Sequence, residues 1–189
     1  MKKIIKIAIN LYRLIIPIVL YRTCKYRSLI EADLRRNGDK GLLITLIDNK
    51  AFRNVFYYRT SKQKILSTLS RIFLKPLETV ELYISPEKIG GGLRVLHNMG
   101  AVITPYSAGS NLTVGQGVTI GTNTKRDYPS GRHNPVIGDN VHISTNAVVI
   151  GGITIGDNVL VGAGAVVTKD VPSNCVVAGV PARIIERLE

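Results

Sequence analysis

Three histidines are the side chains of this 189-residue sequence that could act as an acid, a base or a metal ligand near neutral pH. His97 lies in the stretch GGLRVLHNMG, His133 follows Arg132 in GTNTKRDYPSGRHNP, and His142 comes nine residues later. A histidine among glycines and aliphatic residues is either a packed core side chain or the base of an active site. The choice depends on the elements that position it.

An apolar repeat of six residues runs through the C-terminal half. It forms two columns of aliphatic or small residues, the second four positions after the first: Ile137, Ile143, Val149, Ile155, Val161 and Val167, then Val141, Ala147, Ile153, Val159, Ala165 and Val171. Neither an α-helix nor a flat strand has this period. Three sides of six residues per turn predict a left-handed parallel β-helix, a triangular prism with the columns inside.

One segment interrupts the repeat between Ile120 and Ile137. Residues 122–136 are rich in Gly, Asn, Pro, Ser and charges, which predicts a loop. One turn of the prism takes about eighteen residues, and His97 and His133 are 36 apart. We therefore expect these two histidines to lie near each other on adjacent turns, or to face one another across a subunit boundary.

The positive charge is concentrated in the first 80 residues. They hold 17 Lys and Arg against 5 Asp and Glu, a balance of +12, which equals the net charge of the whole chain. This predicts a basic α-helical region over residues 1–80 and a mostly β prism with a C-terminal tail over residues 81–189.

The opening stretch MKKIIKIAINLYRLIIPIVLYR is too often interrupted for a signal peptide or a spanning helix. An amphipathic basic helix that packs on its own protein is favoured over one that touches anionic lipid. With two cysteines, Cys24 and Cys175, the chain lacks a disulfide framework, so we expect a cytoplasmic protein, with the inner face of the membrane as the alternative.

Further helices are predicted in the basic region. Ser28 and Glu31 have capping-box spacing at the start of one helix, and KGLLITLIDNKAFRNVFYYR continues the helical pattern. The aromatic residues Phe52, Phe56, Tyr57 and Tyr58 predict a helix-packing face. No nucleic-acid-binding motif accompanies them, so no nucleic-acid partner is expected.

The repeat, the loop that interrupts it and the ending GAGAVVTKDVPSNCVVAGVPARII resemble the hexapeptide-repeat acyltransferases. Within them, KIGGGLRVLHNMGAVI, GQGVTIG, GRHNPVIGDNV and AGVPARII resemble the serine acetyltransferases and the O-acetyltransferases of bacterial capsule and exopolysaccharide gene clusters. The resemblance covers about residues 80–189. It implies an acetyl-CoA-dependent O-acetyltransferase that forms a homotrimer, with L-serine as the acceptor; a sugar hydroxyl of a glycan is the alternative.

The resemblance also implies roles for single residues. His97 stands at the position of the catalytic base, and His133, preceded by Arg132, stands where the family's loop histidine contacts substrate near the reacting groups. Acetyl transfer from a thioester to a hydroxyl needs such a base for the hydroxyl proton.

Two departures from the family concern acidic residues. Leu96 replaces the aspartate that directly precedes the catalytic histidine, and Leu82 or Tyr83 falls where an orienting aspartate is expected, with Glu81 as the nearby acid. An uncharged hydroxyl acceptor needs no acidic counter-ion, so the sugar alternative stays open.

For acetyl-CoA, the resemblance implies a groove between neighbouring prisms that meets backbone groups at the corners of the turns. Lys169 and Arg183 are cationic side chains suited to the phosphates of the coenzyme. The matching positions are Gly121, Thr122, Thr145, Ala163, Lys169, Gly179 and Arg183.

A metal site is the rival interpretation of the histidines, since carbonic anhydrases of the gamma type hold a metal on this fold through three histidines. Their third ligand follows after five residues, whereas His142 comes nine after His133, so no metal is expected. A non-catalytic scaffold is the third class, and the presence of both His97 and His133 argues against it.

Overall fold

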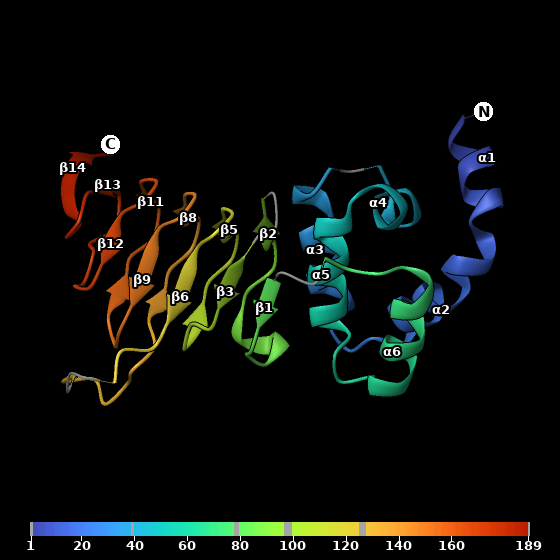
Figure 1. Ribbon diagram of the computed structural model, residues 1–189, viewed down its shortest axis with the longest axis horizontal. Coiled ribbons are helices and arrows are strands. Elements are labelled where there is room, and N and C mark those ends of the chain that lie inside the picture. The colour runs from blue at the N-terminus through green and yellow to red at the C-terminus, as the bar shows by residue number, and fades with distance from the viewer. Residues whose placement is uncertain (1, 39, 78–79, 97–99, 125–127, 189) are drawn as a thin grey trace.

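The computed structural model describes residues 2–38, 40–77, 80–96, 100–124 and 128–188, with side chains from residue 4 onward. Helices come first along the chain and short strands follow, and the two sets form the two ends of an elongated molecule (Figure 1). The helices are α1 (Lys2–Ile9), α2 (Leu11–Thr23), α3 (Arg27–Arg36), α4 (Leu42–Asp48), α5 (Lys50–Arg59) and α6 (Lys64–Phe73). None of the helices within these residues is long and apolar enough to cross a bilayer.

Two details of the helices differ from the sequence pattern. The helix expected to start at Ser28 begins one residue earlier, so Ser28 lies inside its first turn and caps nothing. Glu31 instead accepts hydrogen bonds from Arg27, at 3.0 Å, and from the hydroxyl of Tyr21, at 2.7 Å. The long stretch after Gly41 is divided at Asn49, whose side-chain oxygen accepts a hydrogen bond from the backbone N–H of Phe52 at 2.9 Å and so starts α5.

The aromatic residues of α5 form the packing face that the sequence predicts. Phe52 and Phe56 have no exposed surface, and the side chains of Tyr57 and Tyr58 are also buried. The hydroxyl of Tyr57 makes two contacts, because it donates to the carbonyl of Leu74 at 2.8 Å and lies 2.9 Å from the hydroxyl of Ser70.

The strands form a left-handed parallel β-helix with three faces, which confirms the fold predicted from the repeat. The five-stranded face holds β1 (Val80–Leu82), β3 (Ala101–Ile103), β6 (Thr119–Gly121), β9 (Val148–Ile150) and β12 (Val166–Val167). The three-stranded face holds β4 (Ser107–Ala108), β7 (Val136–Ile137) and β10 (Thr154–Ile155). The six-stranded face holds β2 (Arg94–Val95), β5 (Thr113–Val114), β8 (His142–Ile143), β11 (Val159–Val161), β13 (Cys175–Ala178) and β14 (Arg183–Arg187). A short 3-10 helix, η1 (Pro86–Lys88), follows β1, and β14 turns back antiparallel to β13.

Both apolar columns lie inside the prism. The side chains of Ile143, Val149, Ile155 and Val161 are fully buried, and the other members of the columns are buried as well. Each turn therefore stacks its aliphatic side chains on those of the next, which is how a solenoid without a globular core stabilises itself.

A ladder of asparagines marks one corner of the prism, between the three-stranded and six-stranded faces. Asn111, Asn140, Asn158 and Asn174 all adopt left-handed backbone conformations, with φ between 54° and 63°. Asparagine tolerates this conformation because its short side chain bonds locally. Their side-chain amides donate to one another along the corner at 2.8–3.1 Å, which aligns successive turns.

A buried ion pair joins the helices to the prism. The guanidinium of Arg59 on α5 contacts the carboxylate of Asp33 on α3 at 2.8 Å, and neither side chain is exposed. Arg59 also donates to the carbonyl oxygens of the first prism turn, at residues 86, 89 and 90, while the carboxylate of Asp33 accepts from the N–H of Leu93 at 2.8 Å. Burial raises the pKa of Asp33, and the charge of Arg59 opposes that shift.

Candidate functional site

The interrupting segment leaves the prism after β6 and returns at β7, and it projects from the side of the prism (Figure 1). Its base is closed by a hydrogen bond from the N–H of Asn123 to the carbonyl of His133, at 3.1 Å. The side-chain amide of Asn134 donates to the carbonyl of Thr104 at 2.6 Å, and the N–H of Tyr106 donates to the carbonyl of Pro135 at 2.8 Å. These bonds hold Arg132 and His133 against the prism wall.

Two glycines on the next turn let the loop fold back. A Cβ atom at Gly151 would meet the ring of Tyr128, and a Cβ atom at Gly152 would meet the carbonyl of Arg132. The hydroxyl of Ser130 donates to the carbonyl of Gly152 at 3.2 Å, which ties the loop to the same place. The glycine pair is thus required by the close approach of the loop.

Aromatic rings orient the predicted substrate-contacting residues. The guanidinium of Arg132 lies 5.5 Å from the ring centre of Tyr106, and the ammonium of Lys88 lies 5.0 Å from the same ring. The exposed imidazole of His133 packs edge-on to the ring of Tyr128, at 6.3 Å between ring centres.

Two buried polar atoms in this loop lack a hydrogen-bond partner among the described residues: Nε of Arg132 and the hydroxyl of Tyr128. Buried polar groups are normally paired, so these atoms are available to a bound molecule or a neighbouring subunit. The sequence did not point to Tyr106 or Tyr128. The only signal for Tyr128 was the glycine pair that makes room for it.

His97 lies outside the described residues. The residue before it, Leu96, is half-buried, and its N–H donates to the carbonyl of Val114 at 2.8 Å. The position that holds an acid in the family therefore carries an apolar side chain at the end of β2.

The stretch in which an orienting acid was sought is β1 and the residues after it. Leu82 packs against the prism core, whereas Glu81 is exposed and in register with Val102 of β3. Tyr83 is exposed. The family pattern suggested Leu82 or Tyr83, and neither is an acid. Glu81 is therefore the carboxylate that β1 presents.

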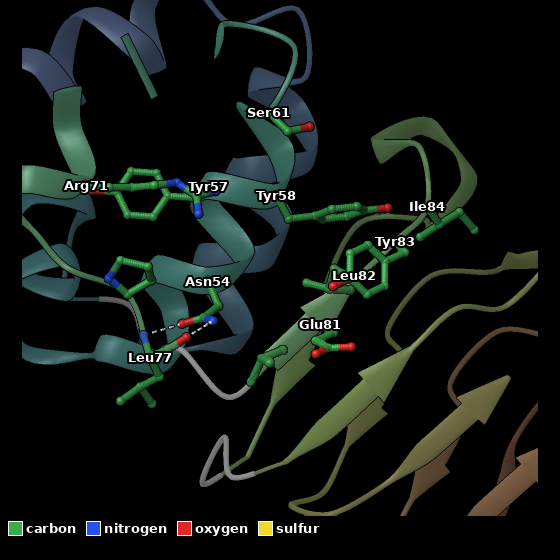
Figure 2. Close-up of a pocket in the computed structure, with 12 residues that line it drawn as sticks. Asn54, Tyr57, Tyr58, Ser61, Arg71, Leu77, Glu81, Leu82, Tyr83 and Ile84 are labelled. Carbon is green, nitrogen blue, oxygen red and sulfur yellow. Dashed lines mark hydrogen bonds between the residues drawn. The ribbon is translucent and has the colours of Figure 1, made fainter. Parts of the chain in front are cut away.

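A cavity of about 390 Å³ separates β1 from α5 and α6 (Figure 2). Much of its polar lining is already bonded. Figure 2 shows the amide of Asn54 joined to Leu77 by two hydrogen bonds, of 2.7 and 2.9 Å, and the hydroxyl of Tyr58 donates to the carbonyl of Ser85 at 3.0 Å. The first two bonds tie α5 to the segment after α6, and the third ties α5 to the segment after β1. We therefore regard the cavity as a structural space between the two regions.

The residues suggested for the coenzyme lie along both edges of the five-stranded face. Thr145, Ala163 and Gly179 follow one another at its corner with the six-stranded face, where the N–H of residue 164 donates to the carbonyl of Thr145 at 2.9 Å. Gly121 ends β6 at the opposite edge, where the buried glycine is followed by the exposed Thr122. The structure thus brings them to one face but not to one point.

Lys169 and Arg183 line a single cavity of about 370 Å³ between the end of β12 and β14. Thr168 and Ala182 also line it, as does Asp170, whose carboxylate accepts a hydrogen bond from the N–H of Thr154 at 2.8 Å. The two cations suggested for phosphate are therefore neighbours in space although 14 residues apart in sequence.

The described residues contain no group of three or more His, Cys, Asp or Glu side chains arranged to hold a metal. His142 lies on the six-stranded face between Thr113 and Leu160, whereas His133 lies on the loop between the other two faces. Burial, together with the nearby charges of Arg36 and Arg94, lowers the pKa of His142 below its ordinary value.

Known proteins resemble both parts of this chain. Residues 134–169 match the family described as bacterial transferase hexapeptide (six repeats). A serine acetyltransferase of Synechococcus elongatus is 41% identical over 125 residues, which cover 66% of this chain and 48% of that protein. A serine acetyltransferase of Bacillus pumilus is 36% identical over 160 residues, which cover 84% of this chain and 69% of that protein.

Solved structures of serine acetyltransferases also resemble this chain. The serine acetyltransferase of Neisseria gonorrhoeae superimposes with a TM-score of 0.65 at 30% identity, covering 87% of this chain and 66% of that one. The same enzyme in complex with serine gives a TM-score of 0.63 at 29% identity, covering 84% and 68%. A serine acetyltransferase in complex with CoA gives 0.59 at 28% identity, covering 83% and 66%.

The interrupted prism and the hexapeptide match define a hexapeptide-repeat transferase. The extent of the similarity is specific enough to go further. The chain belongs to the serine acetyltransferase family, and it spans about half the length of the Synechococcus relative.

Proposed function

We propose that this chain is an acetyl-CoA-dependent O-acetyltransferase of the serine acetyltransferase type. The observation that carries the proposal is the extent of the family similarity, which includes helices as well as prism and covers 84% of the chain. The complexes of related enzymes with serine and with CoA support the same two substrates here.

In this proposal His97 is the general base. It removes the proton of the acceptor hydroxyl as the oxygen attacks the thioester carbonyl carbon of acetyl-CoA. The tetrahedral intermediate then collapses, the carbon–sulfur bond breaks, and the departing thiolate takes the proton from the imidazolium. The products are the acetyl ester and free CoA.

Arg132 and His133 contact the substrate beside the reacting groups in this proposal. Arg132 is a suitable donor because its charge is permanent and its buried Nε has no partner among the described residues. Its stacking on Tyr106 restricts the guanidinium before substrate arrives, which reduces the entropic cost of binding.

Acetyl-CoA lies, in this proposal, along the five-stranded face. Its arm contacts backbone groups at Gly121, Thr122, Thr145, Ala163 and Gly179, and its phosphates contact Lys169 and Arg183. The shared cavity of the two cations supports the phosphate assignment.

We propose a homotrimer, because the coenzyme-binding positions occupy two edges of one face and a neighbouring prism would close the groove between them. The unpaired atoms of the loop would also find partners at such a boundary. We place the enzyme in the cytoplasm, where acetyl-CoA is available.

L-Serine is the acceptor that the family favours, and a sugar hydroxyl is the second candidate. The observation that favours a sugar is Leu96, an apolar residue where the family holds an acid near the acceptor. Glu81 is the exposed acid on β1 that could replace it for an amino-acid acceptor.

The deciding experiment measures CoA thiol release from acetyl-CoA with L-serine and with a panel of sugar derivatives. We expect turnover with L-serine. Turnover with sugars alone would change the acceptor and leave acetyl transfer intact, whereas release with none of the acceptors would overturn the proposed activity. If the wild type uses a sugar, Leu96→Asp should gain activity on L-serine or lose activity on the sugar.

A further inference from the structure

Helices α1, α2 and α6 lie at the end of the molecule away from the prism (Figure 1). All three expose large apolar side chains. Ile4 on α1 is 73% exposed, Ile15 on α2 is 56% exposed, and Ile65 on α6 is 78% exposed. We name the whole set the apolar end face: Ile4, Ile5, Ile9, Leu11, Tyr12, Ile15, Val19, Ile65, Leu69, Ile72 and Phe73.

Helix α6 buries a polar side and exposes an apolar side, the reverse of the usual arrangement in an isolated soluble chain. Its inner side carries Ser67 and Ser70, which are buried, and the Ser70 hydroxyl lies 2.9 Å from that of Tyr57. Its outer side carries Ile65, Leu69 and Ile72, spaced by four and three residues on one helical face. The helix thus turns an apolar stripe away from the core of its own protein.

The exposed stripes of α2 and α6 are continuous. The rings of Tyr12 and Phe73 pack edge to face at 6.5 Å, and Arg13 on α2 donates to the carbonyl of Phe73 at 2.9 Å. Helices α2 and α6 therefore hold their exposed apolar residues beside each other. An exposed apolar surface of this extent marks an interaction site.

Charge selects the occupant of this face. The described acids of residues 1–80 are each bonded to a cation of the same chain: Glu31 to Arg27, Asp33 to Arg59 and Asp48 to Lys6. The same helices carry exposed cations, Arg22 on α2 and Lys64 on α6. A second copy would bring one +12 region against another, whereas an anionic surface would complement it.

We propose that the apolar end face docks on the surface of an anionic lipid bilayer. The isoleucines, leucines and aromatic residues enter the boundary between headgroups and acyl chains, and the exposed cations of α2 and α6 contact lipid phosphates. This surface role is independent of acetyl transfer, because none of its residues has been assigned to the reaction.

The test is co-sedimentation of the full chain with vesicles of phosphatidylcholine, with and without about 30% phosphatidylglycerol. The outer variant Ile65→Ser/Leu69→Ser/Ile72→Ser should lower the partition coefficient at least ~10-fold. Ile185→Ser removes an equally apolar side chain, 65% exposed, at the opposite end of the molecule, and should leave binding unchanged. Thermal melts and thiol release should match the wild type in both variants.

A second variant tests the charge. Arg22→Gln/Lys64→Gln should weaken binding to the anionic vesicles roughly 10-fold and have little effect on phosphatidylcholine alone. Wild-type protein that ignores both vesicles, or an outer variant that binds as well as wild type, would overturn the proposal. Light scattering provides the other contrary result. If the wild type does not bind vesicles but forms an assembly that the outer variant disrupts, a second copy of the chain is the occupant and the proposal is wrong.

Discussion

At the scale of the residue, the proposed chemistry depends on a few side chains placed by their neighbours. Arg132 and His133 owe their positions to two tyrosine rings and to the hydrogen bonds at the base of the loop. The sequence supplied the histidines and the arginine, because their types and motif are recognisable. It could not point to Tyr106 or Tyr128, because their contacts with the loop residues arise only in the folded structure and do not follow from the six-residue repeat.

Replacing His97 by alanine removes the proposed base. We expect turnover to fall at least ~100-fold with little change in acetyl-CoA affinity, since a general base contributes about that much. Steady-state thiol release and equilibrium CoA binding measure the two quantities. His142→Gln is the matched histidine control and should keep normal turnover; a near-wild-type rate for His97→Ala would remove His97 from the mechanism.

At the scale of the element, the six-residue period predicted the prism because it depends only on local chain geometry. Every residue of both columns is buried as expected. The helices were less predictable. Glu31 bonds Tyr21 of α2 instead of capping α3, a tertiary contact that capping spacing does not reveal.

Columns and loop should respond differently to substitution. Ile155→Asp places an unpaired carboxylate inside the prism and should abolish folding. Arg132→Ala and His133→Ala alter the loop, outside the columns, and should lower turnover while leaving the melting temperature nearly unchanged. Thermal melts of the three variants provide the comparison, and similar losses of stability in all of them would contradict this division.

His142 predicts a pH dependence of stability. Its folded-state pKa is lowered by burial and by Arg36 and Arg94, while its strand neighbours Thr113 and Leu160 do not titrate near neutrality. As pH falls, the unfolded chain therefore binds a proton at His142 before the folded chain does. The free energy of unfolding should decrease over the pH range between the ordinary pKa of histidine and the lower pKa of His142 in the folded state. Urea unfolding at about pH 7.5 and about pH 5.5 should show a smaller decrease in His142→Gln. An identical decrease in both proteins would exclude His142 as its source.

At the scale of the whole molecule, one buried ion pair connects the basic helices to the prism. Arg59 satisfies three carbonyls of the first prism turn as well as Asp33, so the pair serves both regions at once. Sequence alone did not suggest it, because Asp33 and Arg59 lie on separate helices and contact a third segment.

Asp33→Ala should leave the Arg59 charge buried without its partner. We expect a loss of about 3–5 kcal/mol in the free energy of unfolding. Urea denaturation measures it, and Glu31→Ala on the same helix, where the ion pair is exposed, should cost less than about 1 kcal/mol. Comparable effects of the two substitutions would show that the buried pair does not join the regions.

The way the loop is attached has a consequence for evolution. The strands on either side of it, β6 and β7, pair with other turns of the prism, so the ladder does not depend on how many residues lie between them. Doubling a flexible loop costs only about 0.6 kcal/mol in closure entropy. Mutation can therefore lengthen, shorten or replace this segment while the prism persists, so the side chains that it presents can change without a new scaffold.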